Sequence, residues 1–534
     1  MQNHATQAPP DTGFAPEHIA AVIREVRASA DVLVRARDGM RGLRFSDAAR
    51  SGTETGTGTG SSVIGTLPPL YPEWLGDRTF CRDHGVRFPY AAGEMANGIA
   101  TPRLVVAMAR AEMLGFFGAA GLGLGRVEQG IDELCGALGE APNWGVNLIH
   151  SPTEPGVEER TVDLLLAKRV PAVSASAFMD LTPAVVRCAI AGLHVDPAGR
   201  IARRRRLLAK LSRPEVAARF LSPAPSAMLR ELVERGGLTA AEARLAERIP
   251  LAQDITVEAD SGGHTDNRPL ASLFPAIVDL RDRLAARLGL DESVRIGAAG
   301  GLGTPGALAA AFALGADYVV TGSVNQLAVE AGLSDDAKDL LGQADIADVT
   351  MAPAADMFEL GVKVQVLRKG TMFAGRAGQL YEWYRDYPSL SALPAEVVGK
   401  LEKNVLGASV DEVWAWTRAF WQQRDPREVA RAEQDPKHRM ALVFRWYLGS
   451  ASRWAIEGEP TRRTDYQIWC GPAVGAFNRW SADGFLARPA NRSVVQIALN
   501  LLEGAAVFSR AQQARSHGLA VPRAAFAFSP RRLA

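Results

Sequence analysis

The sequence predicts an α/β protein, a (β/α)8 TIM barrel that carries an inserted hairpin and helical segment and a mainly helical C-terminal domain. Three observations predict this fold. Short apolar runs bounded by turn residues recur eight times between residues 88 and 321. A threonine followed by proline, a typical helix start, stands at Thr101, Thr182 and Thr304. The last two apolar runs end in glycine turns, where barrels of this kind hold a phosphate.

The eight runs are short and apolar, which suits strands buried on both faces of a parallel sheet. Helical stretches separate most of them, such as the alanine-rich 307–314 after the seventh run. This alternation predicts a parallel sheet that closes on itself. We expect the strands at 88–92, 116–120, 144–149, 171–174, 207–212, 255–258, 294–299 and 317–321.

The stretch 294–325 also contains Gly301-x-Gly303-x-x-Gly306, the pattern of a dinucleotide-binding turn. A Rossmann unit needs an acidic residue at the end of the following strand to bind the ribose. That position holds Thr321-Gly322-Ser323, so we reject the Rossmann fold. Two successive strand ends that expose backbone N–H groups instead predict a cup for a single phosphate.

Composition restricts the protein to a few classes. A net charge of +1 over 534 residues argues against bulk binding of nucleic acid. Four widely spaced cysteines indicate neither a disulfide framework nor a metal site, which fits a cytoplasmic protein. The first residues lack the features of a signal peptide, and Arg110 and Glu112 interrupt the most apolar stretch, 104–125. We therefore expect neither secretion nor a membrane span.

The chain divides into four predicted parts. Residues 1–62 hold a helix at 16–37 and a Gly/Thr/Ser linker at 51–62. The barrel follows at 63–329, with insertions at 185–206, expected to form a hairpin, and at 222–250, expected to form two short helices. The Thr182-Pro183 start could open either a helix or this hairpin. A mainly helical domain is expected at 330–520, before a tail at 521–534.

Function is expected at the carboxyl ends of the strands. His264 and His150 are the two histidines at such ends, and Ser261-Gly262-Gly263 before His264 favours a role in the site. For His150, a structural and a functional role stay equally open. Asn147 is either a buried amide bonded to backbone or a ligand contact. Glu94 is either solvated or functional. Lys210 is either a solvated strand end, which is the favoured interpretation, or a contact for an anion.

A basic run, Arg200–Arg206, lies in the predicted hairpin with little acidic counter-charge nearby. A run of this kind most often forms a solvated face. The alternative is a docking surface for an acidic partner, formed by Arg203, Arg204, Arg205 and Arg206.

Several motifs together resemble the nitronate monooxygenase-like family of FMN barrels, which includes a flavin-dependent enoyl reductase. They are Met95–Pro102, Gly145-Val-Asn-Leu148, Ser261-Gly-Gly-His264, Ala298-Ala-Gly-Gly301 and Gly322-Ser323. Beyond residue 322, the chain is similar to the trans-acting enoyl reductases of polyketide and polyunsaturated fatty acid synthases. The motifs that carry this likeness are Gly322–Gln326, Ala344–Asp348, Met351–Phe358, Asp435–His438 and Asp465–Pro472.

The resemblance implies FMN at the barrel mouth, NADPH as hydride donor and an α,β-unsaturated thioester on an acyl carrier protein as substrate. Matched motif by motif, the flavin ring is expected near Ala92, Gly93, Glu94, Asn147 and Gly263, and the phosphate near Gly300, Gly301, Gly322 and Ser323. His264 matches the active-site histidine of the family, and no metal is implied.

Two other functions stay open at this point. A nitronate monooxygenase would use the same flavin site, but it leaves the helical extension and the basic run unexplained. A scaffold without activity would not need the intact glycine turns and His264. A homodimer is possible.

Overall fold

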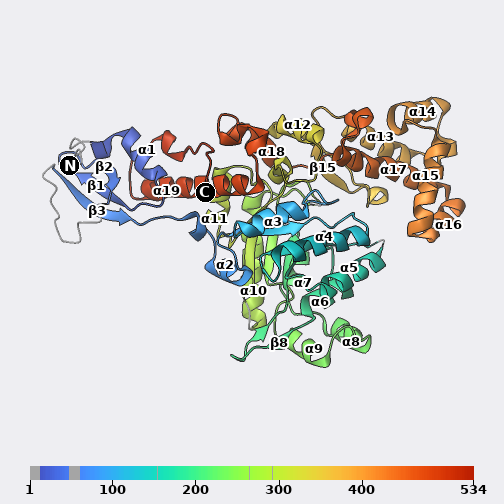
Figure 1. Ribbon diagram of the computed structural model, residues 1–534, viewed down its shortest axis with the longest axis horizontal. Helices are drawn as coiled ribbons and strands as arrows, with labels where there is room; N and C mark the ends of the chain where they lie inside the picture. The colour runs from blue at the N-terminus through green and yellow to red at the C-terminus, as the bar shows by residue number, and fades with distance from the viewer. Residues whose placement is uncertain (1–11, 47–59, 153, 264, 291–292) are drawn as a thin grey trace.

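The structure is a computed structural model that describes residues 12–46, 60–152, 154–263, 265–290 and 293–534 (Figure 1). Eight parallel strands close a barrel in which β13 pairs with β4, so the predicted (β/α)8 fold is confirmed. Each predicted strand is present, with ends that differ by a few residues. The strands are β4 (Tyr90–Ala92), β5 (Leu114–Phe117), β6 (Trp144–Ile149), β7 (Ala172–Ser176), β10 (Arg206–Leu211), β11 (Asp254–Glu258), β12 (Arg295–Ala299) and β13 (Val319–Thr321).

Helices cover the outside of the barrel, and the three Thr-Pro pairs begin helices as predicted. In each pair the threonine hydroxyl accepts a hydrogen bond from the backbone N–H three residues on. Thr182-Pro183 therefore opens a helix and not a hairpin. The barrel helices are α2 (Arg78–His84), α3 (Pro102–Arg110), α4 (Leu124–Leu138), α5 (Pro155–Ala167), α6 (Pro183–Ile190), α7 (Pro214–Phe220), α10 (Leu270–Leu288) and α11 (Pro305–Ala313).

The helix that packs outside the last barrel strand, β13, comes from much later in the chain. α19 (Val494–Ser516) packs against both α11 and α3, which flank the position outside β13 (Figure 1). It therefore occupies the place of the eighth barrel helix, although it lies inside the range expected to form the helical domain. By length and composition α19 is also the one described helix that could cross a membrane, and 72% of its most apolar window is buried in the protein.

The two predicted insertions are present, the first of them shorter than expected. After α6, a small hairpin pairs β8 (His194–Val195) with β9 (Ile201–Ala202). The second insertion forms two helices as predicted, α8 (Ser226–Glu234) and α9 (Ala240–Ala246). All of these elements lie at the bottom of Figure 1, at the amino-terminal ends of the strands.

The N-terminal part corrects the predicted helix at 16–37. The helix α1 ends early (Pro16–Arg24), and the chain continues as a three-stranded antiparallel sheet in the order β2-β1-β3. The sequence Ala-Asp-Val-Leu-Val-Arg of β1 contains two β-branched valines, which favour a strand. Most of the predicted linker lies outside the described residues, and its last two residues begin β3. The strands are β1 (Ala30–Arg35), β2 (Arg41–Phe45) and β3 (Ser61–Leu67).

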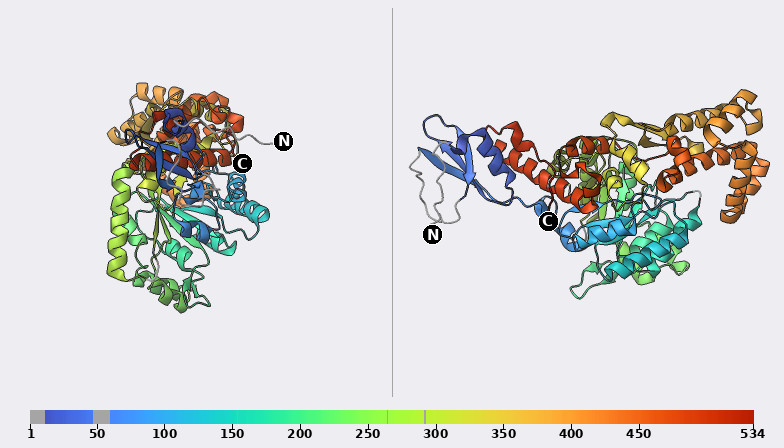
Figure 2. Two further views of the ribbon diagram at one scale, coloured as in Figure 1. Left: turned by 90° about the vertical axis from the view of Figure 1, so that its left-hand side faces the viewer. Right: turned by 45° about the horizontal axis from the view of Figure 1, so that its top comes forward.

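This sheet and α1 pack on the distal half of α19 through one apolar cluster, which includes Ile23, Val32, Val507 and Ala511. The first and last parts of the chain thus share a core. Figure 2 shows this unit at one end of the molecule and the helices α14 to α16 at the other.

The part between β13 and α19 is mainly helical, as predicted, but it also contains an antiparallel hairpin of β14 (Val349–Pro353) and β15 (Lys363–Leu367). The predicted tail packs back on α19, where Asn500 exchanges hydrogen bonds with the backbone of Arg531. The helices are α12 (Asp335–Gly342), α13 (Phe373–Asp386), α14 (Ala395–Lys400), α15 (Val410–Arg424), α16 (Pro426–Gln434), α17 (Pro436–Glu457) and α18 (Ala473–Ser481).

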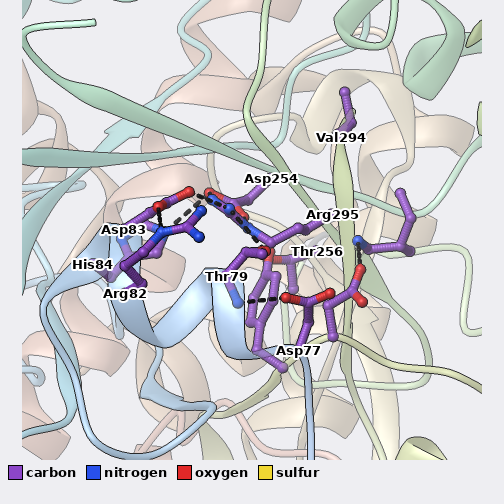
Figure 3. A network of polar contacts seen from close by, with 12 residues as sticks. Asp77, Thr79, Arg82, Asp83, His84, Asp254, Thr256, Val294 and Arg295 are labelled. Atoms are coloured by element: carbon purple, nitrogen blue, oxygen red, sulfur yellow. Dashed lines mark hydrogen bonds and ion pairs between the residues drawn. The ribbon is translucent and has the colours of Figure 1, made fainter. Parts of the chain in front are cut away.

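A buried network of charges lies at the amino-terminal ends of β11 and β12 (Figure 3). Arg295 donates to Asp254 at 2.6 Å and to Asp83 at 2.7 Å, and His84 Nε2 lies 3.0 Å from Asp254. Burial alone would raise the pKa of Asp254, but His84 and Arg295 outweigh it and hold that pKa below its ordinary value. The network ties α2 to the strands at the end of the barrel opposite the carboxyl ends.

Candidate functional site

Two glycine turns lie at the carboxyl ends of β12 and β13, as predicted for a phosphate cup. Gly300 and Gly301 both have positive φ, 86° and 72°, which favours glycine. A methyl group on Gly300 would lie 2.7 Å from the Ala259 carbonyl carbon, so this turn is closely packed on one side. A methyl group on Gly301 or Gly322 would meet nothing within 4 Å. The backbone at these two positions is therefore open to a bound group.

The segment 469–473 packs over these turns, although it comes from the other end of the chain. The Gly471 N–H donates to Ser323 Oγ at 3.1 Å. A methyl group on Gly303 would lie 2.0 Å from Ala473 O, and one on Gly262 would lie 2.8 Å from Cys470 N. Three strand ends, those of β11, β12 and β13, are thus in contact with one short segment.

A buried cluster of charges lies at the carboxyl ends of β4, β10 and β11. Lys210 Nζ is 2.9 Å from Glu94 Oε1 and 3.2 Å from Glu258 Oε1, and the three side chains are 16%, 5% and 11% exposed. Burial by itself lowers the pKa of the Lys210 ammonium, but Glu258 and Glu94 outweigh it and raise that pKa above its ordinary value. The interpretation of Lys210 as a solvated strand end is therefore wrong, because strand ends of a closed barrel converge.

The loop after β11 folds back on this cluster. Ser261 Oγ donates to Glu258 Oε1 at 3.0 Å and accepts from the Gly263 N–H at 3.3 Å. A methyl group on Gly263 would lie 3.3 Å from Glu258 Oε1, so glycine lets the loop approach the carboxylate closely. His264, the predicted catalytic histidine, lies outside the described residues. Its role stays a prediction.

Asn147 and His150 lie on β6 and directly after it. Asn147 is buried, and its amide donates to Ser174 O at 3.2 Å and to Ser176 Oγ at 2.8 Å. These bonds match the structural alternative, and contact with a ligand stays a prediction. His150 Nδ1 lies 3.3 Å from Glu158, and its ring stacks on Phe178 with the centroids 5.0 Å apart. This pair of contacts fixes the orientation of the imidazole.

Ala92 and Gly93 complete the predicted site at the end of β4. Ala92 is fully buried, and the Gly93 N–H donates to Thr321 O at 2.9 Å. A methyl group on Gly93 would lie 2.8 Å from Val320 Cγ1. The chain therefore passes directly beside the last strand here.

The basic run does not form the predicted docking face. It lies before and at the amino-terminal end of β10, away from the glycine turns. Arg205 is buried and donates to Cys188 O at 3.1 Å, and Arg203 is half-buried and donates to Leu251 O at 2.9 Å. Arg206 is half-buried too, and burial lowers its pKa. Arg204 alone of the four is exposed, because the others satisfy carbonyl groups or enter the barrel wall.

Sequence reasoning missed Glu258 and the polar side chains next to the segment 469–473. Gln326 Nε2 donates to Trp469 O at 2.5 Å, and Gln365 Nε2 donates to Asp260 Oδ1 at 2.6 Å. Strand-end position could have revealed Glu258, but no local signal links Gln365 to the mouth. In the described part of the chain, no group of three or more His, Cys, Asp or Glu could hold a metal ion.

Two family models match the chain. The model for nitronate monooxygenase matches residues 80–377, which include all eight barrel strands and the hairpin of β14 and β15. The model for the inserted helical domain of [acyl-carrier-protein] S-malonyltransferase matches residues 387–466, which correspond to α14 to α17.

Individual relatives agree with this assignment. The enoyl reductase domain of MlnA, from the macrolactin biosynthesis cluster of Bacillus amyloliquefaciens, is 35% identical; the match has a TM-score of 0.78 and covers 83% of this chain and 99% of that one. A polyunsaturated fatty acid synthase polypeptide of Thraustochytrium sp. is 46% identical over 85% of this chain and 31% of its own length. The polyketide biosynthesis protein PksE of Bacillus subtilis is 46% identical over 82% of this chain and 56% of its own length.

The chain thus spans about a third to a little over half of these two curated relatives. Its fold, its glycine turns and these matches define the class, that of the flavin-dependent barrel oxidoreductases. The chain belongs to the nitronate monooxygenase family, and within it to the enoyl reductases related to the MlnA domain.

Proposed function

We propose that the chain is an NADPH-dependent, FMN-containing enoyl reductase that acts in trans on α,β-unsaturated acyl thioesters bound to an acyl carrier protein. The observation that carries the proposal is the match to the MlnA enoyl reductase domain, which extends over 99% of that domain. In the net reaction, the carbon–carbon double bond gains a hydride at the β-carbon and a proton at the α-carbon, and the nicotinamide cofactor is oxidised.

The residues at the mouth fit FMN. At Gly301 and Gly322 an added Cβ would meet nothing within 4 Å, so there is room beside the backbone, and together with Gly300 and Ser323 these residues would hold the phosphate. Ala92, Gly93, Glu94, Asn147 and Gly263 would surround the ring. When bound, the flavin supplies the capacity to accept hydride from NADPH and to deliver it to an activated alkene.

The charged cluster supports the proposal through a hydrogen-bond donor that is already oriented. The ammonium of Lys210 is fixed between Glu94 and Glu258, so its position is defined before any ligand binds. An ammonium has three N–H donors, and with two of them facing the glutamates the third can donate to a bound group without reorganisation. Lys210 is therefore proposed to bind and orient the ring system.

His264 keeps the role that the family motif implies, which is to position the thioester or to assist protonation at the α-carbon. His150 is the second proposed catalytic residue. Its imidazole is oriented by Glu158 and Phe178, as a general acid or a hydrogen-bond donor requires.

The carrier protein remains the proposed source of the substrate, since the curated relatives are components of fatty acid and polyketide synthesis. The basic run is not retained as its docking surface, because Arg205 is buried and only Arg204 is exposed among the four predicted arginines.

A spectrum of the purified protein tests the proposal. We expect flavin absorption that NADPH bleaches under anaerobic conditions and that a crotonyl thioester then restores. Consumption of a nitronate with oxygen, without any response to the thioester, would assign the chain to nitronate oxidation instead. A colourless protein that cannot be loaded with FMN would rule out both activities.

A further inference from the structure

Two glutamines at the barrel mouth have a buried amide oxygen without a hydrogen-bond partner among the described residues. Gln326 is 4% exposed and Gln365 is 9% exposed, and the Oε1 atom of each is unpaired. Buried amide oxygens are nearly always hydrogen-bonded, so each such atom requires an explanation. The amide nitrogen of each glutamine fixes the orientation of its side chain. Gln326 Nε2 donates to Trp469 O, and Gln365 Nε2 donates to Asp260 Oδ1.

The position of the Gln365 oxygen is well defined. It lies 3.3 Å from the place where a Cβ on Gly471 would stand, and that same place is 3.1 Å from the Ser261 Cα. Gly471 in turn donates its N–H to Ser323. The oxygen of Gln365 is therefore beside both the loop after β11 and the turn after β13.

The hydrogen-bonding capacity of the Gln365 amide oxygen determines which groups it can bind. An amide oxygen accepts hydrogen bonds, so it cannot pair with a phosphate dianion, which also only accepts. It pairs with a hydroxyl or an N–H group. At the mouth, the backbone N–H groups at Gly301 and Gly322 suit the phosphate, and the amide oxygens suit the group next to it in FMN, which is the polyhydroxylated ribityl chain.

We propose that Gln365, supported by Gln326, binds the ribityl chain of the flavin by accepting hydrogen bonds from its hydroxyl groups. The cofactor site is then formed by two parts of the chain, the barrel turns and the hairpin of β14 and β15 held by the segment 469–473. Figure 1 places β15 and α18 together above the barrel strands, in agreement with this arrangement. The inference rests on the proposed flavin cofactor.

The test compares Gln365→Leu with the wild-type protein for three ligands, after removal of the flavin. FMN and riboflavin carry the ribityl chain, whereas lumiflavin carries a methyl group in its place. Dissociation constants come from the quenching of flavin fluorescence. We expect Gln365→Leu to bind FMN and riboflavin about tenfold more weakly, and lumiflavin as tightly as the wild-type protein does.

Gln253→Leu is the matched control. Gln253 also has a buried, unpaired amide oxygen, but it stands directly before β11, at the opposite end of the barrel. Its FMN affinity should not change. If Gln365→Leu does not fold, Gln365→Asn withdraws the amide by one carbon and should show the same ligand pattern.

Unchanged FMN affinity in Gln365→Leu, or an equal loss for lumiflavin, would overturn the proposal while leaving the flavin cofactor intact. If the wild-type apoprotein binds none of the three flavins, the proposed function fails and this inference fails with it. The two failures are thus distinguishable.

Discussion

The backbone N–H of Gly471 donates a hydrogen bond to Ser323 Oγ across 3.1 Å, although 148 positions separate the two residues in the sequence. Ser323 belongs to the last glycine turn of the barrel, and Gly471 lies two residues before the start of α18. Together with the close packing of Gly303 on Ala473, this bond makes the late part of the chain a wall of the mouth. The helical region is therefore part of the site.

Replacement of Gly301 by valine should abolish retention of FMN. The position has a φ of 72° and no atom within 4 Å of an added Cβ, so a valine side chain would occupy the space proposed for the phosphate. The flavin-to-protein absorbance ratio after purification measures the effect. Gly289→Val is the control, because Gly289 also has a positive φ and open space but caps α10 far from the mouth. A Gly301→Val protein that stays yellow and fully loaded would refute the phosphate site.

His264→Ala should keep its flavin and lose enoyl reduction by about 100-fold or more, the usual contribution of a proton-transferring residue. Thioester-dependent oxidation of NADPH measures turnover, and the absorption spectrum measures flavin content. His194→Ala, on the exposed hairpin of β8, should leave both unchanged. Unchanged turnover in His264→Ala would remove this residue from the mechanism.

Lys210→Met should destabilise the protein by about 3 kcal/mol near pH 7, because Glu94 and Glu258 are then buried without their shared cation. Stability should recover in part when Glu94→Gln is added, because that change removes one of the two carboxylates that face each other. In the wild-type protein, Glu258 and Glu94 outweigh burial and raise the pKa of Lys210, so its ion pairs make the stability depend on pH. Its contribution is present below about pH 10 and is lost as the solution becomes more alkaline.

Urea denaturation of Lys210→Met at pH 7 measures this loss of stability. The double variant Lys210→Met/Glu94→Gln is the control, since it removes the repulsion and should lose less stability than the single variant. An equal loss of stability in the two variants would contradict the proposed charge balance.

Arg295→Met should destabilise the protein by about 3 to 5 kcal/mol, because among the described residues it leaves the buried Asp254 with His84 as its one remaining ion-pair partner. Burial lowers the pKa of His84, so this histidine is a poor substitute for the lost cation. The midpoint of thermal unfolding should fall while flavin content at low temperature stays unchanged, since the network lies at the far end of the barrel. Loss of flavin without loss of stability would indicate coupling between the two ends.

The sequence was sufficient for the barrel because the signals of its strands are local. Each strand is a short apolar run, and the threonine caps at Thr101, Thr182 and Thr304 mark helix starts within three residues. The same local reasoning failed at residues 25–37, where tertiary packing on α19 decides in favour of β1. Local helix propensity could not reveal that packing.

The site was only partly predictable for a related reason. Glycine turns can be read from one segment, but the ion pairs of Lys210 join residues on three strands, so they depend on how the barrel closes. Gln365 and the segment 469–473 are even less accessible, because their place at the mouth depends on contacts across more than a hundred residues. The prediction of a docking surface on the basic run failed because the sequence does not show which arginines donate hydrogen bonds to carbonyl groups.

The position of α19 has a consequence for how the protein is made. All eight strands leave the ribosome well before residue 494, yet the helix that covers the gap between α11 and α3 is translated after the entire helical region. During synthesis the nascent chain must therefore carry an incomplete barrel with exposed apolar surface on that side. Such intermediates are prone to aggregate and are typical clients of chaperones.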